Sequence, residues 1–144
     1  MNYRWGADVP LFTNILALWN PIGSGKNLSL LQVNIAASLG VSSTVLAELI
    51  FFTNIIGGTN INSNIIKYKP NSQNYIANIF AGGTLTLATV IDRRTISVNL
   101  ATPSYDIEFA QELEIPPGKG VCLVHESEYS TNLFYPYATF SWFE

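Results

Sequence analysis

The chain has 144 residues, of which 48% are hydrophobic and only 12% are charged, and its formal net charge at pH 7 is −3. This length fits one domain with a full hydrophobic core. With only 7 Lys and Arg residues, nucleic acid is not an expected partner, because a phosphate backbone requires clustered basic groups. A membrane span is not expected either, since the longest apolar stretch, residues 45–52, is far short of roughly 20 residues.

The low charge also bears on self-association. Soluble monomers normally use charge to stay apart, and charged residues make up roughly 25% of an average protein. A weakly charged surface rich in Asn, Ser, Thr and apolar side chains therefore favours a chain that is partly covered by other protein. We expect a homo-oligomer.

Residues 1–10 are predicted to form an N-terminal arm that precedes a domain spanning residues 11–144. The arm lacks the apolar core of a signal peptide. It carries Tyr3, Arg4 and Trp5, residue types that dominate interface hot spots. These three side chains are the predicted interface residues, with the arm anchored on a neighbouring subunit.

A first strand is expected over residues 11–19, and a sharp corner follows it at residues 20–27. Pro21 fixes its own φ, while Gly23 and Gly25 accept positive φ without a Cβ clash, so these three residues are predicted to be structural turn residues. The corner does not fit a phosphate-binding P-loop, because one residue separates the glycines and Asn follows the lysine.

The next two segments are predicted to be strands. In residues 27–36 the apolar alternation slips by one position between Leu30 and Leu31, which predicts a β-bulge or a crossing between two sheets. Residues 44–52 fit a buried strand or a short helix, and their β-branched and aromatic content favours the strand.

The Asn-rich residues 53–78 are expected to form a large loop with one or two short edge strands. Strands follow over residues 84–90 and 95–100, with a second slip in the alternation near Ala88 and a turn at residues 92–94. Further strands are expected over residues 105–109, 113–115, 120–125 and 137–143. About eight short strands between turn signals predict an all-β, single-domain antiparallel sandwich or barrel.

The second sharp corner lies at residues 115–120. Here Pro117 and Gly118 have the order that a type II turn requires, with positive φ at the glycine, and they complete the predicted structural turn residues. The single cysteine, Cys122, follows in an apolar run and is expected to be a buried, inert thiol in a chain without an internal disulfide.

Few residues have the spacing that catalysis or metal binding requires, and no catalytic, metal or cofactor site is predicted. The lone His125 lacks a zinc ligand set. Two carboxylate pairs have i, i+2 spacing, as glycosidases or calcium sites use, although a solvated strand face explains them as well. A sugar-stacking platform is a further possibility for the loop aromatics, although packing is their commoner use. These residues are Asp106 with Glu108, Glu112 with Glu114, and Tyr129, Phe134 and Tyr135.

Three motifs occur together: Leu18–Leu28 (LWNPIGSGKNL), Ile115–Val121 (IPPGKGV) and the terminal Phe140–Glu144 (FSWFE). In these the chain resembles small jelly-roll structural proteins of tailed bacteriophages, which carry an L-x-N-P-x-G-S-G-x-N-L corner, a P-P-G corner and a Trp-containing last strand. The resemblance spans roughly residues 16–144 and is specific at the corners. It implies a trimeric or higher jelly roll on the capsid or tail surface, without an active site.

The function expected from this resemblance is that of a non-enzymatic virion protein, a capsid decoration (cement) protein. Its expected partners are its own copies, as a trimer, and the major capsid protein or another virion protein. It would be made in the host cytoplasm and reside on the capsid surface. The alternative is a receptor- or glycan-binding tip domain of a head or tail fibre. A glycan-active enzyme using the carboxylates is a third and lesser interpretation.

Overall fold

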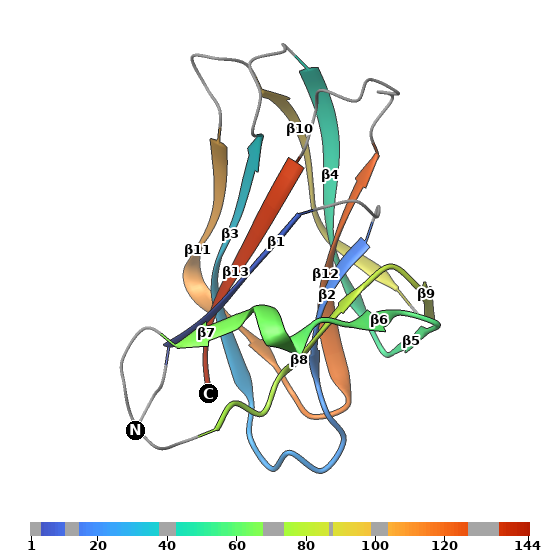
Figure 1. The fold of residues 1–144 in the computed structure, drawn as a ribbon, viewed down its shortest axis with the longest axis vertical. Coiled ribbons are helices and arrows are strands. Elements are labelled where there is room, and N and C mark those ends of the chain that lie inside the picture. The colour runs from blue at the N-terminus through green and yellow to red at the C-terminus, as the bar shows by residue number, and fades with distance from the viewer. Residues whose placement is uncertain are drawn as a thin grey trace.

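The computed structural model describes residues 4–10, 15–37, 43–67, 74–86, 88–98, 104–126 and 136–144. These residues form two antiparallel sheets that face each other, and a third, two-stranded sheet lies outside them (Figure 1). Every strand pair in the described part of the chain is antiparallel. The expected all-β antiparallel sandwich is therefore confirmed.

The first sheet has five strands in the order β11-β3-β13-β1-β7. The bounds of its strands are β1 Arg4–Pro10, β3 Leu28–Ala37, β7 Ile65–Lys67, β11 Ser104–Ile115 and β13 Pro136–Phe143. The short β7, which follows the 3-10 turn η1 (Asn62–Asn64), is one edge of this sheet, and β11 is the other.

The second sheet has six strands in the order β10-β4-β12-β2-β8-β6. Its strands are β2 Ile15–Asn20, β4 Ser43–Phe52, β6 Thr59–Asn60, β8 Asn78–Ala81, β10 Thr89–Val98 and β12 Lys119–Glu126. The two-residue β6 and the ten-residue β10 are its edges. The Asn-rich stretch supplies the expected short edge strands, β6 and β7, but it also contains β5 (Asn54–Ile56) and η1, so it is not the single large loop that was expected.

Eight of the strands have six residues or more, namely β1, β2, β3, β4, β10, β11, β12 and β13. Successive members of this set lie in opposite sheets, except that β4 and β10 are neighbours in one sheet. The chain therefore crosses repeatedly between the two layers, and strands that are distant in sequence become neighbours.

The main core lies between the two sheets. Every second residue of the central strands faces it, so that Leu16 and Leu18 of β2 share one apolar cluster with Phe140 and Trp142 of β13, all of them fully buried. This alternation is the pattern of a strand with one face in a core. Both sheets contribute to one continuous apolar cluster.

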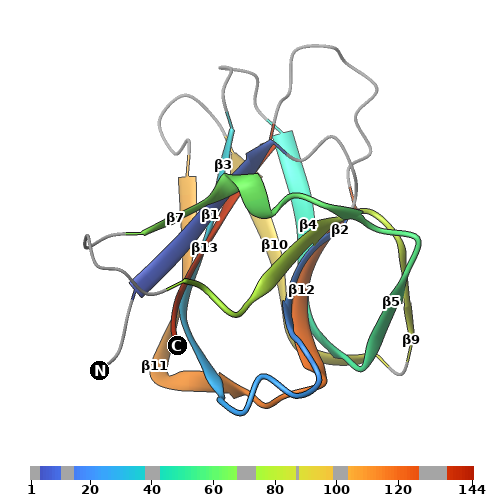
Figure 2. The same cartoon turned by 60° about the horizontal axis from the view of Figure 1, so that its bottom comes forward.

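A second, smaller core covers the opposite face of the six-stranded sheet. It contains Ala17, Ile50, Phe52 and Cys122, and the third sheet, β5 (Asn54–Ile56) with β9 (Thr84–Thr86), packs against it. Figure 2 shows β5 and β9 outside the strands β2 and β12. The inner strands of this sheet are therefore buried on both faces, which explains their nearly continuous apolar sequences.

The predicted irregularity in β3 is confirmed. Along β13 the register steps from Ser141 paired with Gln32 to Trp142 paired with Leu30, so that Leu31 is an extra residue. The ladder with β11 is irregular at the same place. The extra residue lets Leu30 and Val33 both face the core, although an odd number of positions separates them.

Several expectations differ from the structure. The strand expected over residues 84–90 is split between β9 and β10, and those expected over residues 105–109 and 113–115 form one strand, β11. Residues 4–10 are not an arm, because they form β1, which pairs with β13 along its whole length and with β7 at Trp5–Ala7. Their backbone hydrogen bonds belong to the first sheet. The expected turn at residues 92–94 is also wrong, since β10 continues through it opposite β4, with its irregularity between Val90 and Asp92.

Candidate functional site

The two corners predicted from the sequence lie side by side at one end of the sandwich, seen at the bottom of Figure 1. Asn20 joins them. Its side-chain Nδ2 donates to the carbonyl oxygens of Lys26 and Ile115, both at 2.8 Å, and its own carbonyl oxygen accepts from Gly118 N at 2.8 Å. We call residues 20–27 and 115–119 together the corner junction.

Asn20 is fully buried, and its Oδ1 has no hydrogen-bond partner among the described residues. The opposite amide orientation would place Oδ1 against two carbonyl oxygens, so the partners of Nδ2 fix the orientation. The lack of a partner for Oδ1 costs free energy, and the two hydrogen bonds that Nδ2 donates offset this cost. Asn20 therefore holds the two corners together through its hydrogen bonds.

Both corners are turns that depend on glycine. Ser24 N donates to Pro21 O at 3.2 Å with Gly23 at φ +83°, and Lys119 N donates to Pro116 O at 3.1 Å with Gly118 at φ +76°. A type II turn has positive φ at the third turn position and negative φ at the second, which Pro117 imposes in the second corner. The predicted type II turn at Pro117-Gly118 is therefore confirmed, and Gly25, at φ +71°, also meets its expectation.

The corner junction presents an apolar side chain to solvent. Ile22 is 85% exposed although it lies in a hydrogen-bonded turn, and a Cβ at Gly118 would lie 3.2 Å from its Cγ1. Pro116 and Pro117 are also exposed. A rigid, apolar end of this kind is suited to contact with another surface, because little conformational entropy remains to be lost on binding.

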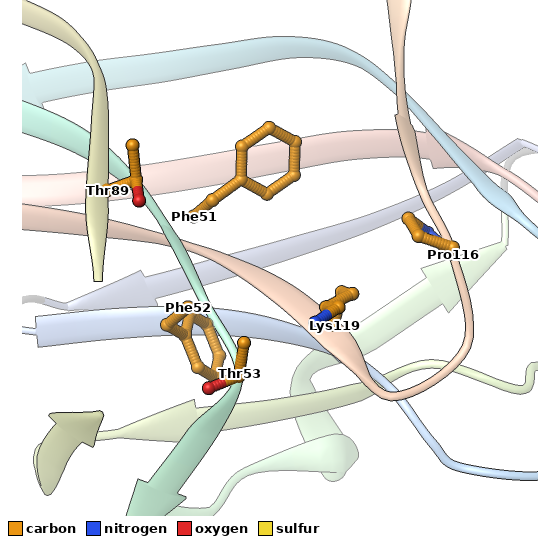
Figure 3. A pocket seen from close by; sticks show the side chains of 6 residues that line it. All are labelled: Phe51, Phe52, Thr53, Thr89, Pro116 and Lys119. Atoms are coloured by element: carbon orange, nitrogen blue, oxygen red, sulfur yellow. The ribbon is translucent and has the colours of Figure 1, made fainter. Parts of the chain in front are cut away.

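A shallow hollow of about 330 Å³ opens beside the corner junction. Figure 3 shows its lining side chains gathered where β4 ends, β10 begins and the β11–β12 corner passes: Phe51, Phe52, Thr53, Thr89, Pro116 and Lys119. We call it the Lys119 hollow. Sequence reasoning did not find it as a site, because its lining comes from three separated segments.

Phe51 and Phe52 line the hollow from opposite faces of β4, since Phe51 packs against the main core and Phe52 belongs to the second core. Phe52 is 1% exposed and stacks on Trp19, with ring centroids 5.5 Å apart and an interplanar angle of 24°. Its ring lies directly over Gly120, where a Cβ would be only 2.3 Å from the Phe52 Cζ. The absence of a side chain at Gly120 thus lets the aromatic pair lie flat on the sheet.

The predicted interface residues are not gathered into a site. Arg4 and Trp5 lie in β1, opposite Phe143 and Trp142 of β13, and Tyr3 is outside the described residues. Their role in an interface stays a prediction. Arg4 and Trp5 belong to a sheet rather than to a projecting arm.

Cys122 lies at the centre of the second core and is fully buried. Desolvation raises the pKa of its thiol from 9.0 to about 12. A thiol with this pKa carries almost no thiolate at neutral pH, and the thiolate is the nucleophile. The buried position and the raised pKa both agree with the expected inert thiol.

The carboxylates show no catalytic grouping in the described ranges. Asp106, Glu112 and Glu114 are exposed; Asp106 accepts from Asn34 Nδ2, and Glu114 accepts from Asn27 Nδ2 at 3.4 Å. Within those ranges no three His, Cys, Asp or Glu residues lie close enough to hold a metal ion. The predicted aromatic platform of Tyr129, Phe134 and Tyr135 lies outside the described residues.

Comparison of the chain with protein-family models, with curated proteins and with solved structures finds no match. Among the described residues, no helix has both the length and the apolar character needed to cross a membrane.

Proposed function

We propose that the chain is a virion structural protein, a decoration protein that binds its own copies, as a trimer, and the shell of a tailed bacteriophage. In this proposal it is not an enzyme and has no cofactor. It would be made in the host cytoplasm and would reside on the capsid surface, attached to the major capsid protein or to another virion protein.

The observation that carries the proposal is the order of the long strands. When the eight are numbered along the chain, one sheet contains the order 6-3-8-1 and the other 5-4-7-2. We interpret this as a jelly roll, the double-sheet arrangement of two Greek keys that occurs in viral capsid domains. Because one fold serves many functions, this support is an argument from fold analogy.

The surface supplies a mechanism for such a role. Large apolar side chains are exposed at separate places, including Ile22 on the corner junction, Ile56 on β5 and Ile66 on β7. Each of these contacts alone would be weak. On a symmetric shell each contact is repeated many times, and many weak contacts made together give a high overall affinity, which is the principle of avidity.

The test is reconstitution on particles. Particles from a phage with this gene disrupted are incubated with the purified chain, sedimented, and examined by electron microscopy. We expect saturable binding at regular positions on the head. An absence of binding to heads, or binding confined to the fibre or tail tip, would contradict the decoration role.

One observation favours the alternative function, a receptor- or glycan-binding tip domain. The Lys119 hollow combines aromatic and Pro surface with two Thr hydroxyls and an ammonium group, and ligand sites are commonly concave, largely apolar and furnished with a few polar groups. A glycan array with the purified chain tests this alternative directly. No bound glycan, together with attachment to heads, would leave decoration as the better proposal.

A further inference from the structure

The Lys119 hollow has a positive charge at its rim. Lys119 is exposed, and among the described residues no carboxylate forms an ion pair with it. The chain as a whole is acidic, with a net charge of −3. An ammonium group beside an apolar surface can pair with an anionic group of a ligand whose remaining surface is apolar.

The walls of the hollow have two different chemical characters. Phe51 is half-buried and Pro116 is exposed, and together they give an apolar surface. Thr89 is exposed, and its hydroxyl makes no hydrogen bond to a described residue. Thr53 Oγ1 donates to Thr86 O at 3.2 Å, which leaves its lone pairs able to accept. The hollow therefore offers an apolar face, two hydroxyl groups and one cation.

Both walls are held by backbone hydrogen bonds. Lys119 N donates to Pro116 O at 3.1 Å, and Thr53 N donates to Thr86 O at 3.2 Å. The Phe52 ring, which also lines the hollow, is held in place by its stack with Trp19. A ligand would therefore meet a site that is already formed and would not have to order it, which favours even a small ligand.

The geometry points to a carboxylated sugar as the ligand of the Lys119 hollow. The C–H face of the sugar ring would lie on Phe51 and Pro116, its hydroxyl groups would bond to the two Thr hydroxyls, and its carboxylate would pair with Lys119. A wholly apolar ligand fits less well, since the open side would leave much of it in water. A neutral sugar would leave the ammonium group without a partner.

The size of the hollow limits the ligand. Its volume of about 330 Å³ is at the lower end of the roughly 300–1,000 Å³ range of ligand sites. A single sugar ring or a chain end is therefore the expected occupant rather than the middle of a long polymer. The inference rests on the alternative function, a glycan-binding domain, and deepens it by naming the class of sugar, whereas attachment to heads is measured separately.

The experiment is a titration of the ¹⁵N-labelled chain, followed by amide chemical shifts. Glucuronate and N-acetylneuraminate are the probes, and glucose is the neutral counterpart of glucuronate. We expect saturable shifts at Thr53, Thr89 and Lys119 with at least one acid, and about tenfold weaker binding of glucose, the size of effect that a charge-assisted contact supplies.

Two variants separate a specific site from general charge attraction. Lys119→Gln is expected to remove the preference for the acid, whereas Lys26→Gln, at an exposed lysine of the same corner junction outside the hollow, is expected to retain it. Both substitutions are at exposed positions, and the unbound spectrum reports whether each variant is folded. Equal loss in both variants, equal binding of glucose and glucuronate, or no saturable shift with either acid would overturn the inference.

Discussion

The Asn20 side chain is the most informative contact at the scale of single residues. Its Nδ2 satisfies Lys26 O and Ile115 O at once, inside the protein. Asn20→Ala would leave both carbonyl groups without this donor, and we expect a loss of about 2–3 kcal/mol in the free energy of unfolding, measured with urea. Asn20→Asp should cost more at pH 7, because a carboxylate would face two carbonyl oxygens.

Asn27→Ala is the matched control for Asn20. Asn27 is exposed, and its Nδ2 makes a long contact of 3.4 Å with Glu114 Oε2. Removal of this contact should change the free energy of unfolding by no more than about 0.5 kcal/mol. If both alanine substitutions lowered the free energy of unfolding equally, Asn20 would not be what holds the two corners together.

Gly118 is predicted to be a structural requirement of its turn. Its φ of +76° is unfavourable for an L-residue, and a Cβ there would meet Ile22 Cγ1 at 3.2 Å. Gly118→Val should therefore cost about 1–3 kcal/mol, which lowers the melting temperature by roughly 2–8 °C per kcal/mol in a domain of this size. Gly118→Asn should cost less, because Asn tolerates this region better. An unchanged melting temperature for Gly118→Val would contradict the prediction.

Cys122 predicts a dependence of stability on alkaline pH. Its folded-state pKa of about 12 lies above its ordinary value of 9.0, so the folded chain keeps a proton that the unfolded chain releases. This contribution is fully present below about pH 9 and is lost as the pH rises from there towards 12. The difference in free energy of unfolding between the native chain and Cys122→Ala should shrink over that window. A difference independent of pH would indicate that the thiol ionises normally.

The strand β1 is the critical case at the scale of elements. Deletion of residues 1–8 would remove most of β1, which pairs with β13 on one side and with β7 on the other. We expect the melting temperature to fall by more than about 5 °C, as the loss of a few kcal/mol implies. Deletion of residues 1–3 leaves β1 whole and should have little effect. Equal stability of the two truncated chains would restore the interpretation of residues 1–10 as an arm.

The elements also show what the sequence could predict. The slip between Leu30 and Leu31 predicted a bulge or a crossing between two sheets, because a period of two would otherwise turn one apolar set away from the core, and the structure has the bulge. The alternation of Trp5, Ala7 and Val9 with polar or small residues was an equally good strand signal in β1. The position of this segment at the start of the chain led to the wrong expectation of an arm.

The hollow had no comparable signal in the sequence. Its lining joins the end of β4, the start of β10 and the second corner, and their adjacency depends on how strands cross between the sheets. Each lining residue has an ordinary local role: Phe51 and Phe52 continue a strand, and Pro116 belongs to a turn. Local sequence patterns predict individual strands and turns. A site formed by distant segments can be predicted only when the order of the strands in the sheets is known.

At the scale of the whole molecule, the small number of charges decides how copies of the chain would associate. With 12% charged residues and exposed apolar side chains at separate places, association would rest on apolar contacts and hydrogen bonds. Salt screens charges to a range of about 3 Å at 1 M but does not weaken apolar contacts. Association of this chain should therefore be insensitive to salt.

The corresponding prediction is a mass of about three times 15.9 kDa in sedimentation equilibrium at micromolar concentration, unchanged between about 50 mM and about 1 M NaCl. Ile22→Ser should weaken association about ten- to hundredfold, since burial of a large aliphatic side chain contributes about 1.5–3 kcal/mol. Lys26→Gln, in the same corner junction, should leave the mass unchanged. A monomer at every salt concentration, or an oligomer that dissociates as the salt concentration rises, would contradict self-association through apolar contacts. An oligomer that resists salt and is unaffected by Ile22→Ser would place the interface away from the corner junction.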